Sequence, residues 1–112
     1  MASPDELWLV DFGDQFPGEP AHHRPALVVG PPATFGADFP FVLVCPLTTA
    51  RRGLSLHIEV EPDAITGLDQ TSYVQCELVR SVSRRRLVHH VGAIDTHTSA
   101  RVTEILRTLL NH

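Results

Sequence analysis

Prolines and glycines divide most of this chain into short apolar segments, and that division constrains the fold more than any other feature. The segments are rich in β-branched and aromatic residues and have the length of strands rather than helices. Pro46, near the end of one of them, suggests an edge position or a bulge. Strands are expected at Glu6–Phe12, Pro25–Gly30, Phe41–Leu47, His57–Val60, Ser72–Val82 and, from a weaker pattern, Val88–Ile94.

The apolar period changes in the C-terminal tail. Four apolar residues there recur at the spacing of one helix face, namely Val102, Ile105, Leu106 and Leu109. Asp95 or Thr96 could cap the start of this helix. Short strands followed by one amphipathic helix predict an α+β, mainly β fold: a small, strongly bent antiparallel sheet or partial barrel with a helix packed on it. Such an open barrel exposes apolar surface and strand edges, so a homodimer is expected.

The length of 112 residues is enough for one core and predicts a single domain over residues 1–112. Apolar stretches such as Ala26–Val29 and Phe41–Val44 are far too short to span a bilayer. Met1–Glu6 carries acidic residues where a signal peptide would carry basic ones. We therefore expect a cytoplasmic protein with no membrane partner.

The spacing of cysteine and histidine does not predict a metal site. Cys45 and Cys76 lack C-x-x-C spacing and lie in apolar segments, so we interpret them as small buried side chains. The adjacent pairs His22–His23 and His89–His90 are poorly spaced for binding one ion. The sequence also lacks a glycine-rich phosphate loop. No cofactor is expected and, if the protein is an enzyme, no metal.

The net charge of −4 argues against capture of nucleic acid by bulk electrostatics. All nine basic residues are arginine, and most of them fall at Arg51–Arg52, Arg80 and Arg84–Arg86. A biased genome would explain the missing lysines without any function. Arginine nevertheless suits phosphate and base contacts better than lysine does, so the pattern is compatible with a small, local RNA site.

A polar loop that runs directly into an apolar strand is the most informative segment. It brings Glu19, His22, His23 and Arg24 together just before Pro25, which fixes the backbone beside the guanidinium group. Loops held by a rigid scaffold are common places for binding and catalysis. The structural alternative is a solvated loop with a strand-edge arginine in a salt bridge.

Two other segments could contribute chemistry. Thr48 and Thr49 end a strand beside Arg51–Arg52, where hydroxyls could bind a phosphate, although threonines often cap turns. Gln75 and Glu77 would share one face of the strand at Ser72–Val82, where they could read base edges or move a proton. A solvent-facing strand would show the same pattern. For Arg84–Arg86, the polar face of a short helical turn is slightly favoured over a contact patch.

Four segments in order resemble the MazF/PemK family of toxins from toxin–antitoxin pairs, and together they cover nearly the whole chain. They are Leu7–Phe12, which is similar to the opening strand; Gly18–Glu19 with His23–Ala26, similar to the G-x-E…RPA motif; Pro46–Thr49, similar to P-[IVL]-T-[ST]; and Leu68–Arg80 with Arg86–Gly92, similar to the third block. Each segment is weak evidence by itself, and their common order is strong.

The resemblance implies an SH3-like barrel of the CcdB/PemK type, assembled as a homodimer. It also implies a type II toxin that cleaves single-stranded RNA (mRNA, tRNA or rRNA) without a metal. The ribose 2′-OH would attack the adjacent phosphate and leave a 2′,3′-cyclic phosphate and a 5′-OH. We further expect a cognate antitoxin to lay an extended acidic segment over the cleft at Arg24.

Residue roles follow from the same resemblance. Arg24 matches the family's essential arginine, Thr48 its catalytic threonine and Glu19 an acidic loop residue that is important in some members. Substrate contacts are expected at His23, Thr49, Arg51, Gln75 and Glu77.

Two departures from the family pattern shift the expected chemistry. Some members have an arginine and an aspartate where this chain has Gln75 and Glu77, and others have a loop histidine at the place of Gly18. An amide does not titrate, so Arg24 would carry more of the proton transfer, with Glu77 or His23 as a partner.

Two other functions remain as alternatives. A CcdB-like gyrase poison shares the fold but acts by protein binding through its C-terminal helix. The ending Leu110–His112 lacks the Trp-Gly-Ile type of terminus associated with that class. An inactive homologue that only binds its antitoxin is a third reading, and the intact loop motifs argue against it.

Overall fold

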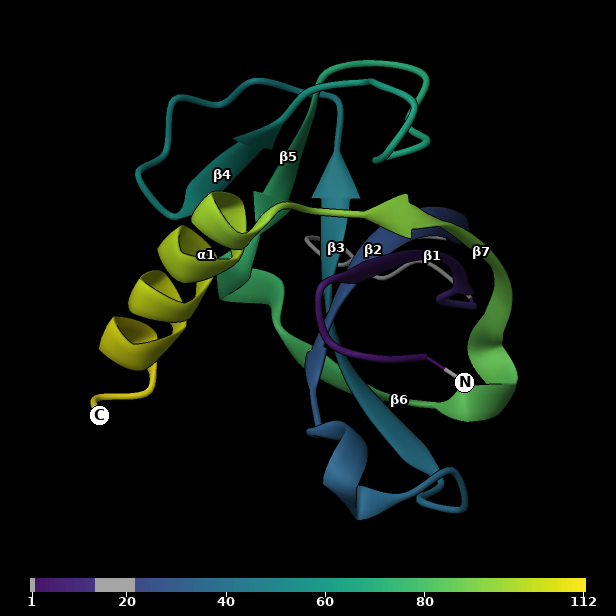
Figure 1. Ribbon diagram of the computed structural model, residues 1–112. Coiled ribbons are helices and arrows are strands. Elements are labelled where there is room, and N and C mark those ends of the chain that lie inside the picture. Colours follow the sequence, from purple (N-terminus) through teal and green to yellow (C-terminus); the bar gives the residue numbers. More distant parts are fainter. Residues whose placement is uncertain (1, 14–21) are drawn as a thin grey trace.

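Strand β3 (Phe41–Thr48) organises the sheet because it pairs with three other strands. In the computed structural model, which describes residues 2–13 and 22–112, the strands form a seven-stranded antiparallel sheet (Figure 1). The other elements are β1 (Glu6–Asp11), β2 (His23–Gly30), β4 (His57–Val60), β5 (Ser72–Gln75), β6 (Arg80–Ser83), β7 (Leu87–Ala93), the helix α1 (Thr96–Leu109) and three short 3₁₀ turns, η1 (Ala33–Phe35), η2 (Cys76–Leu78) and η3 (Arg84–Arg86).

The strand order is β4-β5-β3-β2-β1-β7, and β6 pairs with β3 beside β5. In the described part of the chain, the two end strands, β4 and β7, do not pair, so the bent sheet is an open barrel rather than a closed one. Helix α1 packs on one side of it (Figure 1). The expectation of a mainly β, SH3-like small barrel with a C-terminal helix is confirmed.

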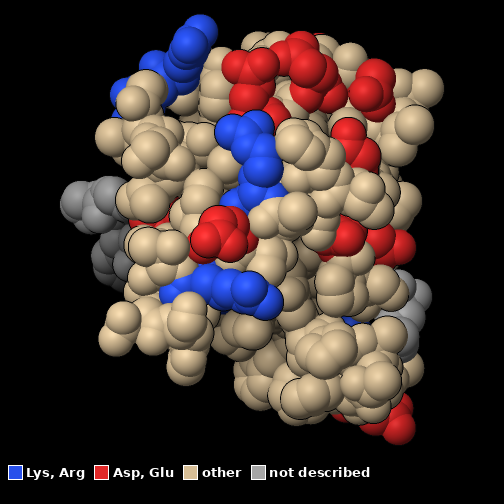
Figure 2. Space-filling view, turned by 60° about the vertical axis from the view of Figure 1, so that its left-hand side comes forward, with Lys and Arg blue, Asp and Glu red and all other residues tan. Residues whose placement is uncertain are grey.

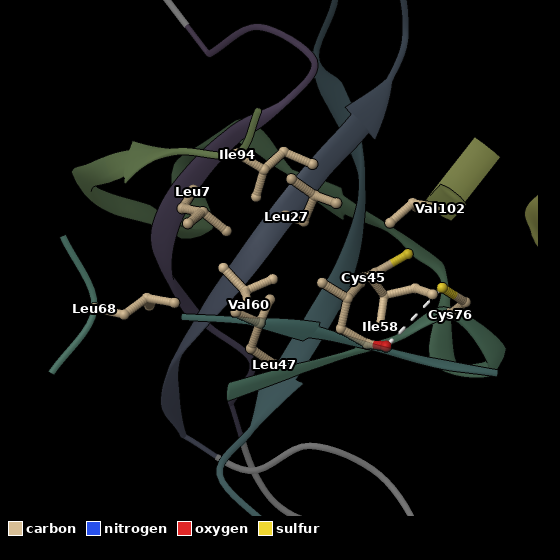
Figure 3. Close-up of a cluster of buried hydrophobic side chains, with 11 residues drawn as sticks. Leu7, Leu27, Cys45, Leu47, Ile58, Val60, Leu68, Cys76, Ile94 and Val102 are labelled. Atoms are coloured by element: carbon tan, nitrogen blue, oxygen red, sulfur yellow. Dashed lines mark hydrogen bonds between the residues drawn. The ribbon is translucent and has the colours of Figure 1, made fainter. Parts of the chain in front are cut away.

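Period-two alternation along the strands creates two cores, one on each face of the sheet. In β3, Val42 and Val44 enter a cluster that also includes Val10 of β1, whereas Cys45 and Leu47 face the opposite side. The second cluster is covered by α1 through Val102 (Figure 3), and its other members are Leu7, Leu27, Ile58, Val60, Leu68, Val74, Cys76 and Ile94. The cysteines are buried and free, as predicted.

The single long strand expected at Ser72–Val82 is wrong. Tyr73 pairs with Thr48, and Arg80 pairs with Val44. Between these pairs β3 advances four residues while the opposite chain advances seven, so three residues are left over and form η2. The segment is therefore two strands, β5 and β6, that follow the same side of β3 with a turn between them.

Pro46 lies inside the central strand and not at an edge of the sheet. It is fully buried and pairs with Ala26 of β2. On the other side of β3, Pro46 lies where pairing passes from β5 to β6, because the paired residues of β6 end opposite Val44 and those of β5 begin opposite Leu47. The edge interpretation is wrong, but the interruption that proline favours is present on the opposite strand.

Helix α1 begins where the cap pattern predicted. A side-chain oxygen of Asp95 accepts a hydrogen bond from the backbone N–H of Thr98 at 2.7 Å. Val102 is buried, Ile105 and Leu106 are partly buried, and Leu109 is 40% exposed. The end of the apolar stripe therefore remains uncovered. No helix in the described residues is long and apolar enough to span a membrane.

Candidate functional site

The ladder between β2 and β3 brings Arg24 and Thr48 to the same end of the sheet. Ala26 pairs with Pro46, and Arg24 and Thr48 each lie two residues beyond that pair. Side chains two residues apart share one face of a strand, so both residues point to the same face. Both are half-buried. The two residues that the motifs identified are 24 positions apart in sequence, and the fold places both just beyond the last β2–β3 pair, at the same end of the ladder.

The hydroxyl group of Thr48 is already oriented by the backbone. Its Oγ1 accepts a hydrogen bond from the N–H of Ala50 at 3.2 Å, which is the turn-capping role considered above. A hydroxyl that accepts still has its own proton to donate. Thr48 can therefore still donate to a phosphate oxygen, and the hydrogen bond from Ala50 fixes the position of its hydroxyl group.

The same face continues across the sheet from Thr48. Tyr73 of β5 pairs with Thr48, and Glu59 of β4 pairs with Tyr73. Gln75 and His57 form the next pair on that face. Tyr73, Glu59 and His57 from these pairs line a hollow of about 170 Å³, together with Arg51, Arg52 and Arg101. We call this space the arginine hollow.

Gln75 and Glu77 are not side by side on an open face, which corrects the expectation for this pair. β5 ends at Gln75, and Glu77 lies in η2, so period-two alternation stops between them. Gln75 is only 6% exposed, and its Oε1 has no hydrogen-bond partner among the described residues. Glu77 is exposed. The turn separates a buried amide from an exposed carboxylate.

His57 is a polar residue of the site that sequence reasoning missed. Its side chain is 3% exposed, and its Nε2 lies 2.9 Å from Oε2 of Glu77. Its Nδ1 is buried with no partner in the described part of the chain. The contact joins residues twenty positions apart in sequence, so no local sequence pattern predicts it. The only sequence signal was the alternation that put His57 and Glu59 on the polar face of β4.

Arg80 supplies a further cation on the face that carries Arg24. It pairs with Val44 of β3, and its guanidinium carbon lies 5.5 Å from the ring centroid of Phe12. This cation–π contact reaches from β6 to the end of β1 across the bent sheet. Phe12 follows Val10 by two residues, and Val10 pairs with Arg24. The contact therefore places a second positive charge toward the Arg24 end of β1 and β2.

The other predicted contact residues are more dispersed. His23 begins β2 and is exposed, and Thr49 and Arg51 are exposed in the connection after β3. Arg51 lines the arginine hollow. Gly18 and Glu19 lie outside the described residues, so the position of the acidic loop residue stays a prediction.

Histidines elsewhere in the described structure do not gather around a common point. His90 makes an edge-on contact with Trp8 and lies 3.8 Å from Glu6, and the Nδ1 of His89 contacts the carbonyl oxygen of His90. Within residues 2–13 and 22–112, no three His, Cys, Asp or Glu side chains are close enough to hold a metal ion.

Comparison with known proteins agrees with this architecture. The family model described as PemK-like, MazF-like toxin of type II toxin–antitoxin systems matches residues 4–110. MazF from Deinococcus radiodurans is similar with a TM-score of 0.84 and 24% identity, over 99% of this chain and 97% of that one. A MazE–MazF structure from the same organism gives a TM-score of 0.79 and 24% identity, over 98% and 96%.

A mycobacterial endoribonuclease solved in complex with its cognate antitoxin is also similar, with a TM-score of 0.79 and 20% identity over 99% of this chain and 96% of that one. At these identities the solved structures establish the fold alone. The family assignment comes from the match over residues 4–110.

Proposed function

Because the chain belongs to the PemK-like, MazF-like toxin family of type II toxin–antitoxin systems, we propose that it is a metal-independent, sequence-selective endoribonuclease that cleaves single-stranded RNA. The observation that carries the proposal is the placement of Arg24 and Thr48 on one face at the same end of the β2–β3 ladder. A guanidinium and a hydroxyl beside one another can hold the non-bridging oxygens of a single phosphate. Cleavage of mRNA, tRNA or rRNA in this way would stop translation and growth.

In the proposed reaction the ribose 2′-oxygen attacks the adjacent phosphorus while the bond to the 5′-oxygen breaks. The 2′-OH gives up its proton and the leaving 5′-oxygen gains one, so the products are a 2′,3′-cyclic phosphate and a 5′-OH. Arg24 stabilises the charge that develops on the phosphate oxygens. The Thr48 hydroxyl, held by the N–H of Ala50, donates to one of them.

The proton transfers fall on few groups. Gln75 cannot titrate and is buried, so it does not replace the arginine that some family members have there. Glu77 contacts His57 and is exposed, which makes it available only near the edge of the site. We propose that Arg24 takes part in proton transfer as well as charge stabilisation, with Glu19 from the loop orienting it. His23, Thr49 and Arg51 contact the RNA.

Two partners complete the proposal. A homodimer is supported by an apolar groove of about 430 Å³ near the β2–β3 connection, where Phe35, Phe41 and Leu43 are exposed. A cognate antitoxin would cover the cleft at Arg24 with an extended acidic segment. If the purified toxin–antitoxin complex kept full RNA cleavage, that placement of the antitoxin would be wrong. The proposed site of action is the cytoplasm.

The test is cleavage of defined RNA by the purified protein in EDTA, with the ends of the fragments identified. Discrete fragments that end in cyclic phosphate are expected. Arg24→Ala should lower the rate by roughly 10²- to 10³-fold, the effect typical of losing a transition-state donor, and Thr48→Ala should also lower it. Arg107→Ala is the matched control, because Arg107 is an exposed arginine on α1.

Unchanged cleavage by Arg24→Ala and Thr48→Ala, or no cleavage by the wild type, would overturn the proposal. Stalling of DNA gyrase would then favour the CcdB-like alternative, and antitoxin binding without either activity would favour an inactive homologue.

A further inference from the structure

We infer that the arginine hollow, formed by Arg51, Arg52, His57, Glu59, Tyr73 and Arg101, binds a backbone phosphate of the RNA next to the scissile one. This inference rests on the proposed function and adds to it a second phosphate subsite, to which the C-terminal helix contributes a residue.

The hollow lies where RNA held at Thr48 would pass. Tyr73 lines the hollow and is the direct register partner of Thr48. Neighbouring strands are separated by about 4.8 Å, so the hollow begins one strand away from the proposed phosphate contact. A nucleic-acid strand bound at Thr48 and continuing over β5 and β4 therefore brings its neighbouring phosphate to the arginines.

Positive charge outweighs negative charge in the walls of the hollow. Three arginines from two separate segments line it, against one carboxylate, that of Glu59. The only ion pairs among residues 2–13 and 22–112 involve histidines, so none of the three arginines has a described carboxylate partner within ion-pair distance. Glu59 shares a hydrogen bond with Glu61, which raises the pKa of Glu59, while Arg51 and Arg101 lower it.

The face shown in Figure 2 has basic groups in separate patches with acidic groups between them, and further acidic groups gathered along one edge. The whole chain has a net charge of −4. An RNA strand on this protein therefore depends on local clusters of arginine and not on a long-range field.

The size and the walls of the hollow favour a phosphate over a base. Its volume of about 170 Å³ is small against the roughly 300–1,000 Å³ of pockets that enclose whole ligands. Arginine forks match phosphate oxygens in pairs of hydrogen bonds. His57 adds a buried Nδ1 without a described partner in the wall. Such backbone contacts position RNA and add affinity without reading its sequence.

The experiment measures binding of the full-length protein to an RNA that carries 2′-deoxyribose at the cleaved position, so that it binds and is not cut. Fluorescence anisotropy is recorded over a series of salt concentrations for the wild type, Arg101→Ala and Arg107→Ala. Arg101→Ala should raise Kd roughly tenfold at low salt and reduce the salt slope by about 0.7, the value for one lost phosphate contact on a single strand. Arg107→Ala should match the wild type, and cleavage-site preference should not change.

A scan with methylphosphonate, which removes one phosphate charge at a time, locates the contact. In the wild type, neutralising one phosphate beside the scissile one should weaken binding roughly tenfold. In Arg101→Ala the same neutralisation should weaken binding less, because one of the arginines that contact this phosphate is already absent. Arg51→Ala provides a second variant from a different segment, and thermal melting of each variant verifies folding.

Equal Kd and equal salt slope for Arg101→Ala and the wild type would overturn the subsite. So would a methylphosphonate profile that Arg101→Ala leaves unchanged. Both results leave the proposed function intact if the wild type cleaves unmodified RNA. Failure of the wild type to cleave overturns the proposed function itself, and the subsite with it.

Discussion

The Nε2 atom of His57 lies 2.9 Å from Oε2 of Glu77, and this contact ties β4 to the turn η2 that separates β5 from β6. The histidine side chain is 3% exposed, so removing Glu77 would leave a buried nitrogen without a partner. The contact therefore links the end strand β4, which carries His57, to the turn η2, which carries Glu77.

A double-mutant cycle should detect this coupling. His57→Ala and Glu77→Ala, measured separately and together by urea unfolding, should show a coupling free energy of about 1 kcal/mol. Glu104→Ala combined with His57→Ala is the control, because Glu104 is exposed on α1 and has no described ion pair. Additive effects for the His57–Glu77 pair would show that the contact does not stabilise the fold.

The backbone of the β4–β5 connection lies so close to β7 that we expect no side chain to be tolerated at Gly92. A Cβ atom there would meet the carbonyl oxygens of Ile65 and Thr66. We expect Gly92→Ala to lower the free energy of unfolding by about 2 kcal/mol or more, because the backbone must move to make room. Gly53→Ala is the control: a Cβ there meets open space, and only the cost of its positive φ, about 1 kcal/mol, applies. Equal urea midpoints for the two variants would contradict the prediction.

The N-cap of α1 predicts a specific pH dependence of stability. The backbone N–H of Thr98 donates to the Asp95 carboxylate and lowers the pKa of that carboxylate below its usual value. The stabilisation is therefore present above the unfolded-state pKa, near pH 4, and is lost as pH falls through the lower folded-state pKa. Asp95→Ala should lower Tm at pH 7, and the difference from the wild type should shrink as the pH is lowered below 4.

Thr96→Ala is the control for that measurement, because Thr96 was the other candidate cap and does not titrate. A Tm difference for Asp95→Ala that stays constant from pH 7 to low pH would show that the charge of Asp95 contributes nothing to the cap.

The two cysteines should be unreactive in the folded protein. Cys45 and Cys76 are fully buried. The hydrogen bond between the two thiols, together with burial, raises the pKa of Cys45, whereas the same hydrogen bond lowers the pKa of Cys76. Because both sulfur atoms are shielded from the reagent, alkylation by iodoacetamide should be slower by roughly 100-fold or more than in urea. Cys76→Ala identifies which thiol reacts. Rapid labelling of one cysteine under native conditions would mean that this core opens locally.

Local patterns predicted most of the secondary structure because burial of one face imposes period two on strands and a 3.6-residue period on helices. The strand at His57–Val60 and the cap at Asp95 illustrate this. The interpretation of Arg84–Arg86 as a short helical turn was also confirmed. The turn η2 could not be predicted, because it arises from a mismatch in length between β3 and its neighbour, and that mismatch exists only once the strands pair.

For the candidate site too, some residues could be predicted from the sequence, and others were found only in the structure. Motifs identified Arg24 and Thr48, and a resemblance to relatives supplied their expected roles. Nothing in the sequence connected His57 to Glu77, or Arg101 to Arg51, because those contacts join different elements of the sheet and helix.

The sequence by itself determined the mainly β architecture, the C-terminal helix and the residue types available for RNA chemistry, since these depend on local periodicity and composition. Only the tertiary structure decided that Gln75 is buried, that Glu77 is bound to a histidine and that three arginines surround one hollow. The physical reason is strand register: a shift of one residue reverses the face of every side chain in a strand, and register is fixed by pairing across the whole sheet.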